Sequence, residues 1–338
     1  MRELVIIVEN LNVKFGKKQV IHDVSFSVKK GEIIGFFGIS GAGKTTIIRA
    51  ITCQLSKKYW TGKILVNGLS PAKKSNHAEI LASIGYVPQL EELNLYYDLK
   101  PKANIDTFAS AYGLKTKKSE EVAEQLFHIL DIPEDTWKKP LERMSGGEKK
   151  RVSMAIGLIH QPEVLFLDEP TTGVDASKRY EILSYLKKLN QTLGTTMFII
   201  SHDMECSLIC DKAAILRQGK ILEFENPQIL ISTLPSKGML ARFTIERLNQ
   251  DVMNVFKTFP VEKIIRVGND VIEVFIENFE QELPNLIEYL IKNNVKINSF
   301  NKDRATFRRY FQLRIQEEEL KEKREWEYQM EVKGGGAK

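Results

Sequence analysis

One segment constrains the fold more than any other, a glycine-rich run directly after a short apolar run. Residues 33–37 read IIGFF, and residues 38–46 read GISGAGKTT, which fits G-x-x-x-x-G-K-[ST]. The apolar run is typical of a strand buried on both faces, and a helical pattern follows it. A glycine-rich loop in this position turns consecutive backbone N–H groups toward one point at a helix N-terminus. The sequence therefore predicts a phosphate-binding loop inside an α/β domain.

The polar side chains of this loop suit a nucleotide with its metal. Lys44 supplies a positive charge for the β- and γ-phosphates, and Thr45 offers a hydroxyl to Mg²⁺. The ordinary alternative is a glycine-rich turn that binds nothing, which this spacing and context disfavour. The other predicted contacts to the nucleotide are Gly38, Ile39, Ser40, Gly41, Ala42, Gly43 and Thr46.

Short apolar runs alternate with helical patterns over most of the chain, which predicts a mainly parallel sheet. The further apolar runs are Ser83–Gln89, Glu163–Glu169, Thr195–Ile200 and Lys212–Leu216. The first 30 or so residues alternate apolar and polar positions instead, as an antiparallel β piece does.

The pattern of apolar and polar residues changes near residue 240. A helical pattern over Ile245–Phe256, a hairpin signal around "GND" and a strand pattern at Val295–Phe300 predict a small α+β domain over 240–315. The last segment, 316–338, is dense in charge and ends near three glycines, which favours a solvated or frayed helix and a disordered tail.

Polar residues follow three of the apolar runs, at the edge of a parallel sheet where ligands bind. Asp168 suits Mg²⁺ through its water shell, and Glu169 suits proton abstraction from an attacking water. His202 suits a contact to the γ-phosphate, and Gln89 can reach metal and water. Taken singly, an Asp-Glu pair is more often a solvated loop and a lone histidine more often a core or capping residue.

Two further features lie away from these strand ends. Ser145-Gly146-Gly147-Glu148 opens a helical pattern and forms a second potential anion site at a helix N-terminus. A capped helix start also accounts for Ser145 and Glu148, but not for the glycines. Phe15 either packs in a core or stacks on an adenine ring.

Composition limits the class of protein. The chain has 43% hydrophobic residues and a net charge of +5, with basic residues scattered, so no nucleic-acid partner is expected. Cys53, Cys206 and Cys210 form no metal or redox motif and are expected to be reduced thiols in a core. No apolar run is long enough for a signal peptide or a membrane span.

Together, these motifs over residues 4–235 resemble the nucleotide-binding subunit of an ATP-binding cassette (ABC) transporter. Gly38–Thr45 matches Walker A, Gln89 the Q-loop, Ser145–Glu148 the signature, Val164–Asp168 Walker B with Glu169 as catalytic base, and His202 the switch histidine. Asp175 matches the D-loop, and Phe15 the aromatic position that stacks on adenine. Met144 in place of a common leucine is a volume-conserving change.

The resemblance implies a P-loop NTPase fold with a helical subdomain at about 90–160, and ATP and Mg²⁺ as ligands. It also implies that two cassettes pack head to tail, so that Ser145 of one copy covers the ATP on the Walker A loop of the other. The second cassette is either the same chain or a similar one. The expected partner is a separate membrane permease, which would hold the chain at the cytoplasmic face of the cell membrane. A groove near Gln89–Leu99 is expected to receive a permease segment, with contacts from Leu90, Leu93, Leu95, Tyr96 and Tyr97.

Export is favoured over import. Phe108, Ala109, Tyr112, Gly113 and Leu114 resemble a segment of single-cassette exporters of drugs, lipids or polysaccharides, although Lys100, Pro101 and Ala103 depart from it. The small C-terminal domain resembles one appended to those exporters. The alternative function is a soluble ABC ATPase that regulates a nucleic-acid or ribosome complex.

Overall fold

The computed structural model describes residues 3–90 and 93–334. The chain forms two compact units, Met1–Asn226 and Pro227–Lys338. The sequence places the boundary between residues 235 and 240; in the structure α7 (Pro227–Ser232) belongs to the second unit, because it packs against α10 (Phe307–Gly334).

The first unit is built on a six-stranded sheet in the order β5-β6-β7-β3-β8-β9. All its strands are parallel except β9, which pairs antiparallel with β8. The strands are β3 (Ile33–Phe37), β5 (Ile84–Val87), β6 (Val164–Asp168), β7 (Thr196–Ser201), β8 (Lys212–Arg217) and β9 (Lys220–Glu225). The predicted mainly parallel sheet is confirmed, and its apolar runs are the buried central strands.

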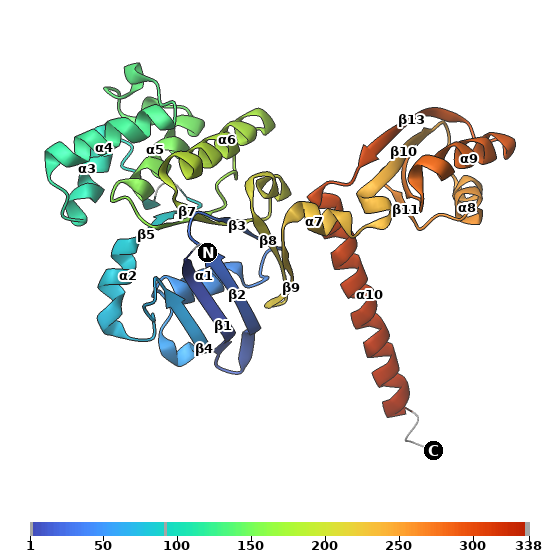
Figure 1. Ribbon diagram of the computed structural model, residues 1–338, viewed down its shortest axis with the longest axis horizontal. Helices are drawn as coiled ribbons and strands as arrows, with labels where there is room; N and C mark the ends of the chain where they lie inside the picture. Colours follow the sequence, from blue (N-terminus) through green and yellow to red (C-terminus); the bar gives the residue numbers. More distant parts are fainter. Residues whose placement is uncertain (1–2, 91–92, 335–338) are drawn as a thin grey trace. The chain divides into compact units, whose positions relative to one another are not determined.

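A second sheet and one helix cover one face of this sheet, and longer helices cover the other (Figure 1). The antiparallel sheet β2-β1-β4 consists of β1 (Leu4–Phe15), β2 (Lys18–Lys29) and β4 (Trp60–Val66). It shares one hydrophobic core with α1 (Lys44–Ile51) and with alternate residues of β3, β6, β7 and β8. On the opposite side lie α5 (Gly146–Leu158) and α6 (Ala176–Leu193). The predicted antiparallel β piece is therefore also confirmed.

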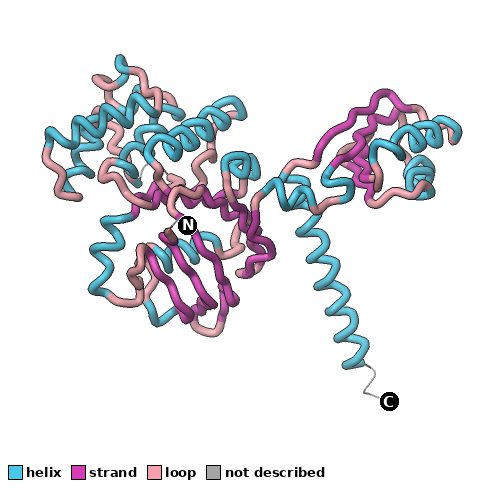
Figure 2. Tube along the Cα trace, viewed as in Figure 1, coloured by secondary structure: helices cyan, strands magenta, loops and turns pink. Residues whose placement is uncertain are grey.

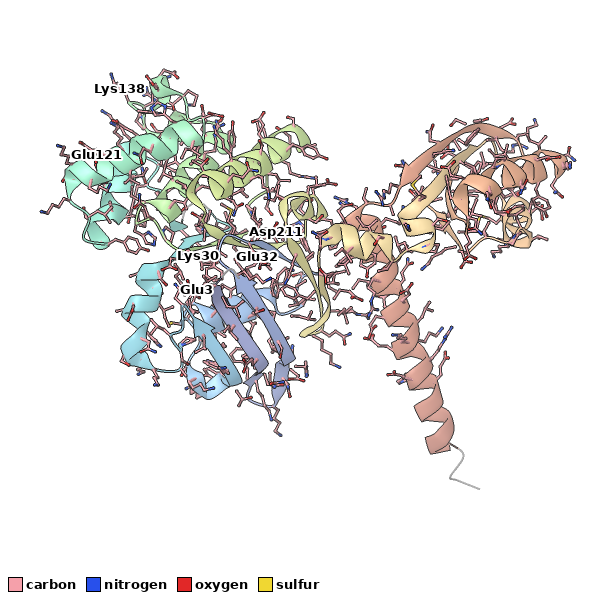
Figure 3. The ribbon with its side chains drawn as sticks, viewed as in Figure 1. Glu3, Lys30, Glu32, Glu121, Lys138 and Asp211 are labelled. Atoms are coloured by element: carbon pink, nitrogen blue, oxygen red, sulfur yellow. The ribbon has the colours of Figure 1, made fainter. Side chains whose placement is uncertain are left out.

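Two acidic side chains, Glu32 and Asp211, accept backbone hydrogen bonds near the amino end of the central strand β3 (Figure 3). The Ile33 amide donates to Asp211 Oδ2 at 2.8 Å, and the Lys29 amide donates to Glu32 Oε2 at 2.9 Å. The first bond ties the start of β3 to the segment before β8, and the second lies in the turn between β2 and β3.

Helices dominate the region between β5 and β6 (Figure 2). α3 (Pro101–Ala111) and α4 (Thr116–Ile129) both contact α5, and α2 (His77–Ser83) precedes β5. Asn104, fully buried on α3, accepts from the Tyr96 amide at 2.7 Å and donates to the Tyr96 carbonyl at 2.9 Å. This pairing anchors the loop that follows β5 to the helical region.

The second unit has the order β-α-β-β-α-β, a split βαβ arrangement. Its sheet, β11-β12-β10-β13, is antiparallel throughout. The elements are β10 (Met239–Ile245), α8 (Gln250–Thr258), β11 (Lys263–Arg266), β12 (Val271–Phe275), α9 (Phe279–Lys292) and β13 (Ile297–Arg304). The predicted helix over Ile245–Phe256 begins too early, because Ile245 ends a central strand whose alternation of buried Ala241, Phe243 and Ile245 went unrecognised.

The structure also differs from the disordered tail expected over 316–338. α10 continues to Gly334, because the segment is rich in helix-forming residues and has ion pairs four residues apart, Arg314–Glu318 at 2.9 Å and Lys323–Glu327 at 3.8 Å. Residues 335–338 lie outside the described part of the chain. Within the described residues, no helix combines the length and apolar character needed to cross a bilayer.

Candidate nucleotide-binding site

A cleft of about 710 Å³ opens where the carboxyl ends of β3, β5, β6 and β7 lie side by side. Every strand contributes the residues that follow its last position, which is where ligands bind in open parallel sheets. The lining residues are Val20, Ile39, Ser40, Gly41, Ala42, Gly43, Lys44, Thr45, Thr46, Gln89, Asp168, Glu169, Ile200 and His202. Segments separated by more than 100 residues thus meet at one edge of the sheet.

The glycine-rich loop has the backbone geometry that its sequence requires. Gly41 and Gly43 have φ of 80° and 105°, in the left-handed region that favours glycine. A Cβ on Gly43 would also lie 2.5 Å from Ile21 Cδ1. The Lys44 ammonium donates to the carbonyls of Gly38 at 2.6 Å and Ile39 at 3.2 Å. The lysine therefore lies across its own loop.

Opposite charges face each other inside the cleft. Burial lowers the pKa of Lys44, and the charges of Glu169 and Asp168 partly oppose that shift. Burial raises the pKa of Asp168, while the Tyr86 hydroxyl, which donates to Asp168 Oδ2 at 3.0 Å, lowers it. The cleft is thus a partly desolvated site in which a cation stands against two carboxyl groups.

Glu169 is held from several sides. Its φ of 51° is left-handed, which is unusual for a residue with a side chain. Its amide donates to the Ile200 carbonyl at 2.8 Å, and its carboxylate accepts from Ser201 Oγ at 3.1 Å and from the His202 amide at 3.1 Å. His202 Nδ1 lies 2.8 Å from Glu169 Oε2. The residue is only 8% exposed, so its carboxylate has a fixed direction.

Gln89 lines the cleft, whereas Phe15 does not. Phe15 is 40% exposed and its ring centroid lies 5.2 Å from that of Tyr59. The core alternative for Phe15 is therefore wrong. Gly38, in contrast, enters the site only through its carbonyl contact with Lys44.

The signature residues and Asp175 lie outside this cleft. Ser145 caps α5 in a capping box: Ser145 Oγ accepts from the Glu148 amide at 3.3 Å, and Glu148 Oε2 accepts from the Ser145 amide at 2.7 Å. Asp175 caps α6 by accepting from the Lys178 amide at 2.9 Å. Both acidic residues therefore have local roles within the chain.

The two glycines of the signature have no such role. A Cβ on Gly146 would meet no atom within 4 Å, and one on Gly147 only the flexible Lys178 Cδ at 3.8 Å. Neither glycine has a positive φ. Within the described part of the chain, no packing contact or backbone angle requires glycine at these two positions.

Sequence reasoning missed Val20 and Ile200, which line the cleft, and three polar or aromatic residues in contact with predicted site residues. Tyr86 and Ser201 hold the two carboxylates, and Tyr59 extends the exposed aromatic surface at Phe15. Tyr86 lies within the predicted run Ser83–Gln89 and Ser201 directly follows the predicted run Thr195–Ile200, so their position near the ligand edge was an available signal. The pairing of Tyr59 with Phe15 depends on the register of β1 and β4, for which the sequence gives no signal.

Comparison with known proteins identifies the family. A family model described as ABC transporter matches residues 21–172. The linearmycin resistance ATP-binding protein LnrL of Bacillus subtilis is 34% identical over 243 residues, which cover 72% of this chain and 75% of LnrL. The chain belongs to the ABC transporter family. As a cassette of that family it is an ATP-binding protein and an ATPase.

Other relatives of the cassette differ in what their names state. The methionine import ATP-binding protein MetN of Haemophilus influenzae is 33% identical over 273 residues, 75% of this chain and 76% of MetN. ABC transporter G family member 20 of Dictyostelium discoideum is 35% identical over 239 residues. The match covers 70% of this chain but only 32% of that longer protein.

Solved structures give the same fold for the ABC cassette. cbiO1 of Clostridium perfringens, part of the transporter complex cbiONQ, superimposes with a TM-score of 0.64 at 27% identity, covering 68% of this chain and 91% of cbiO1. The ATP-binding cassette MJ0796, in a dimer bound to ADP and phosphate, gives 0.57 at 23% identity, covering 65% of this chain and 98% of MJ0796. The predicted ABC cassette fold is confirmed.

Proposed function

We propose that the cleft binds ATP and that Glu169 is the general base of its hydrolysis. The observation that carries this proposal is the fixed carboxylate of Glu169, which lines the same cleft as the phosphate loop and is oriented by Ser201 and His202. Water attacks the γ-phosphorus, Glu169 accepts its proton, and the bond to the β-phosphate oxygen breaks. His202, whose side chain is 62% exposed, orients Glu169 and contacts the γ-phosphate.

The other residues of the cleft hold the substrate. The amides of Gly41–Thr46 surround the phosphates, and Lys44 turns from its loop carbonyls to their oxygens. Thr45, Gln89 and Asp168 would hold Mg²⁺, since the hydroxyl, amide and carboxylate oxygens they offer are the donors this ion prefers. Bound there, Mg²⁺ would neutralise charge on the phosphates. Phe15, with Tyr59, offers a surface for adenine to stack on.

Two cassettes complete each other's site in this proposal. The exposed signature has the anion-binding features of a helix N-terminus, and the space beside Gly146 is open. In this arrangement, the γ-phosphate of ATP bound to a second copy approaches the signature closely. That approach accounts for glycine at positions 146 and 147. Glu148 contributes by fixing the helix start, and Asp175 by lying at the same exposed surface as Lys178 and Gly147.

We further propose that the chain drives a separate membrane permease and so lies at the cytoplasmic face of the membrane. A groove of about 530 Å³ between the central sheet and the helical region has the size and apolar lining to receive a short permease segment. It is lined by Leu81, Tyr86, Asn94, Phe108 and Tyr112, among others. Of the five contacts expected from the sequence none lines this groove: Leu95 is buried, while Leu90 and Leu93 are exposed elsewhere.

Export is the proposed direction of transport. Relatives carry names that point both ways, resistance for LnrL and methionine import for MetN. The segment Phe108–Leu114, similar to that of single-cassette exporters, favours export, and Phe108 and Tyr112 line the groove.

Glu169→Gln tests the proposed base. The amide keeps the shape of the side chain but cannot accept the proton, so we expect ATP hydrolysis to fall about a hundredfold or more while ATP binding is retained. Phosphate release and binding of a fluorescent ATP analogue measure the two properties. The control is Glu163→Gln, directly before β6, where the exposed Glu163 carboxylate lies 4.0 Å from Lys30 Nζ. Full hydrolysis by Glu169→Gln would remove Glu169 as the base.

A further inference from the structure

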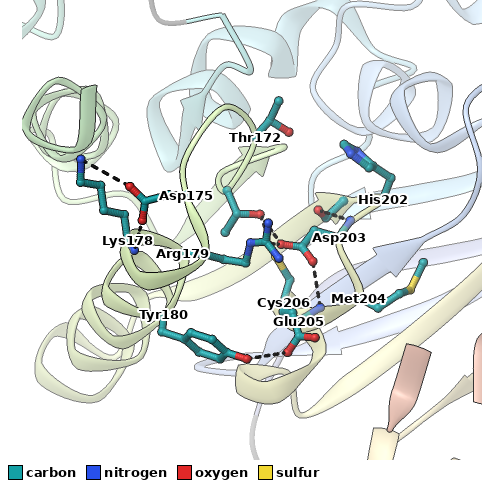
Figure 4. A network of polar contacts seen from close by, with 12 residues as sticks. Thr172, Asp175, Lys178, Arg179, Tyr180, His202, Asp203, Met204, Glu205 and Cys206 are labelled. Carbon is teal, nitrogen blue, oxygen red and sulfur yellow. Dashed lines mark hydrogen bonds and ion pairs between the residues drawn. The ribbon is translucent and has the colours of Figure 1, made fainter. Parts of the chain in front are cut away.

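A charged network joins the first turn of α6 to the segment that follows β7 (Figure 4). At its centre is Asp203, which begins the short helix Met204–Ile209. Asp203 Oδ2 accepts from Thr171 Oγ1 at 3.0 Å and lies 3.0 Å from Arg179 Nε. The Arg179 contact is an ion pair without the alignment of a hydrogen bond. One carboxylate thus holds three segments together.

The same network reaches the carboxylate of Glu169 in two steps. The Asp203 amide donates to Ser201 Oγ at 2.9 Å, and Ser201 Oγ donates to Glu169 Oε2 at 3.1 Å. From the other side, Thr171 lies two residues after Glu169 and is almost fully buried. Asp203 therefore fixes both chain segments that determine where Glu169 points.

The backbone conformation of Glu169 requires contacts that hold it in place. A left-handed φ on a residue with a side chain persists only where the surroundings over-determine it. The ion pair is well shielded for a pair near the surface, with side-chain exposures of 28% for Arg179 and 11% for Asp203. A parallel contact, from the Tyr180 hydroxyl to Glu205 Oε2 at 3.3 Å, joins the same two elements but is exposed.

We infer that Arg179 and Asp203 are positioning residues for the catalytic base, acting through Thr171 and Ser201. Neither touches the nucleotide cleft. This inference rests on the proposed role of Glu169. It assigns to the first turn of α6 a function in setting the rate of hydrolysis that is separate from ATP binding.

Arg179→Gln and Asp203→Asn in the full-length chain test it. Both remove the ion pair, and asparagine can still cap the short helix. We expect kcat for ATP hydrolysis to fall about tenfold or more in each, because small displacements of a reacting group are costly, with the KM for ATP changed less than about twofold. Rates are expressed per ATP-analogue binding site, so that any misfolded fraction does not lower them. The Arg179→Lys protein is expected to keep at least about half of kcat.

The double variant Arg179→Gln/Asp203→Asn is expected to be no slower than the slower single variant, because the two residues act through one contact. Lys188→Gln is the control. Lys188 lies on the same helix, α6, and the substitution removes its exposed ion pair with Asp131 at 3.4 Å. Wild-type kcat in Arg179→Gln, multiplied effects in the double variant, or an Arg179→Lys protein as slow as Arg179→Gln would overturn the inference. If Glu169→Gln itself hydrolyses ATP normally, the proposed base fails instead, and the two failures are distinguishable.

Discussion

Glu169 concentrates most of the site's local constraints in one residue. Its left-handed backbone costs of the order of 1–3 kcal/mol, a cost that is typical of functional positions. Hydrogen bonds from Ser201 and His202 to the carboxylate offset that cost and fix its direction. A residue of this kind can be recognised in a sequence as a polar position after a strand, but its strain cannot.

The cysteines give a prediction at the same scale. All three are free, as expected, and burial raises the pKa of Cys53 to about 11 and that of Cys206 to about 12. Since only the thiolate reacts, alkylation by iodoacetamide at pH 8 should be at least about tenfold slower in the native protein than in urea. The native rate should rise as the pH is raised toward 11. Equal rates at pH 8 in the two states, followed by mass spectrometry, would contradict this prediction.

At the scale of elements, α10 is tied to the second unit's sheet through a buried glutamate. Glu273 on β12 is 1% exposed and lies 2.9 Å from Arg242 on β10 and 2.7 Å from Arg309 on α10. This carboxylate compensates the charge of both arginines at that point, and Arg242 also contacts Asp303 at 3.2 Å.

Glu273→Gln should therefore lower the free energy of unfolding by about 3 kcal/mol, because it leaves the arginines facing a neutral group. Urea unfolding followed by circular dichroism measures the change as a lower midpoint. Glu280→Gln is the matched control, since it removes an exposed pair with Lys302 at 2.6 Å. Equal midpoints for both variants would show that the buried network does not stabilise the unit.

The accuracy of sequence-based prediction varies among the elements for physical reasons. Buried parallel strands such as β6 and β7 are continuous apolar runs and were found with their polar ends. β10 was missed, because its pattern follows directly on a helix and a turn and is only partly apolar. The extent of α10 was missed, because a helix stabilised by ion pairs and helix propensity lacks the apolar stripe that periodicity detects.

The site likewise contains residues that the sequence predicts and contacts that it does not predict. The phosphate loop, Gln89, Asp168, Glu169 and His202 line one cleft, because parallel strands bring their carboxyl ends to one edge. The contacts of Tyr86, Ser201 and Asp203 depend on side-chain directions across neighbouring strands and were not predictable from spacing.

At the scale of the whole molecule, the cleft and the signature lie apart on one cassette. The cleft holds the phosphate loop and the proposed base, Glu169, while the signature lies outside it at the start of α5. The proposal that a second cassette joins them makes ATP a ligand of the dimer, so binding and association are linked.

Ser145→Arg should then prevent association without loss of ATP binding to the monomer.

The molar mass of Glu169→Gln in solution with ATP and Mg²⁺ tests this account most directly. Light scattering should give twice the 38.7 kDa of one chain for Glu169→Gln. The double variant Glu169→Gln/Ser145→Arg should give the mass of one chain. A mass of one chain for Glu169→Gln, with ATP bound at saturation, would contradict the proposal that the signature of one cassette closes the nucleotide site of another.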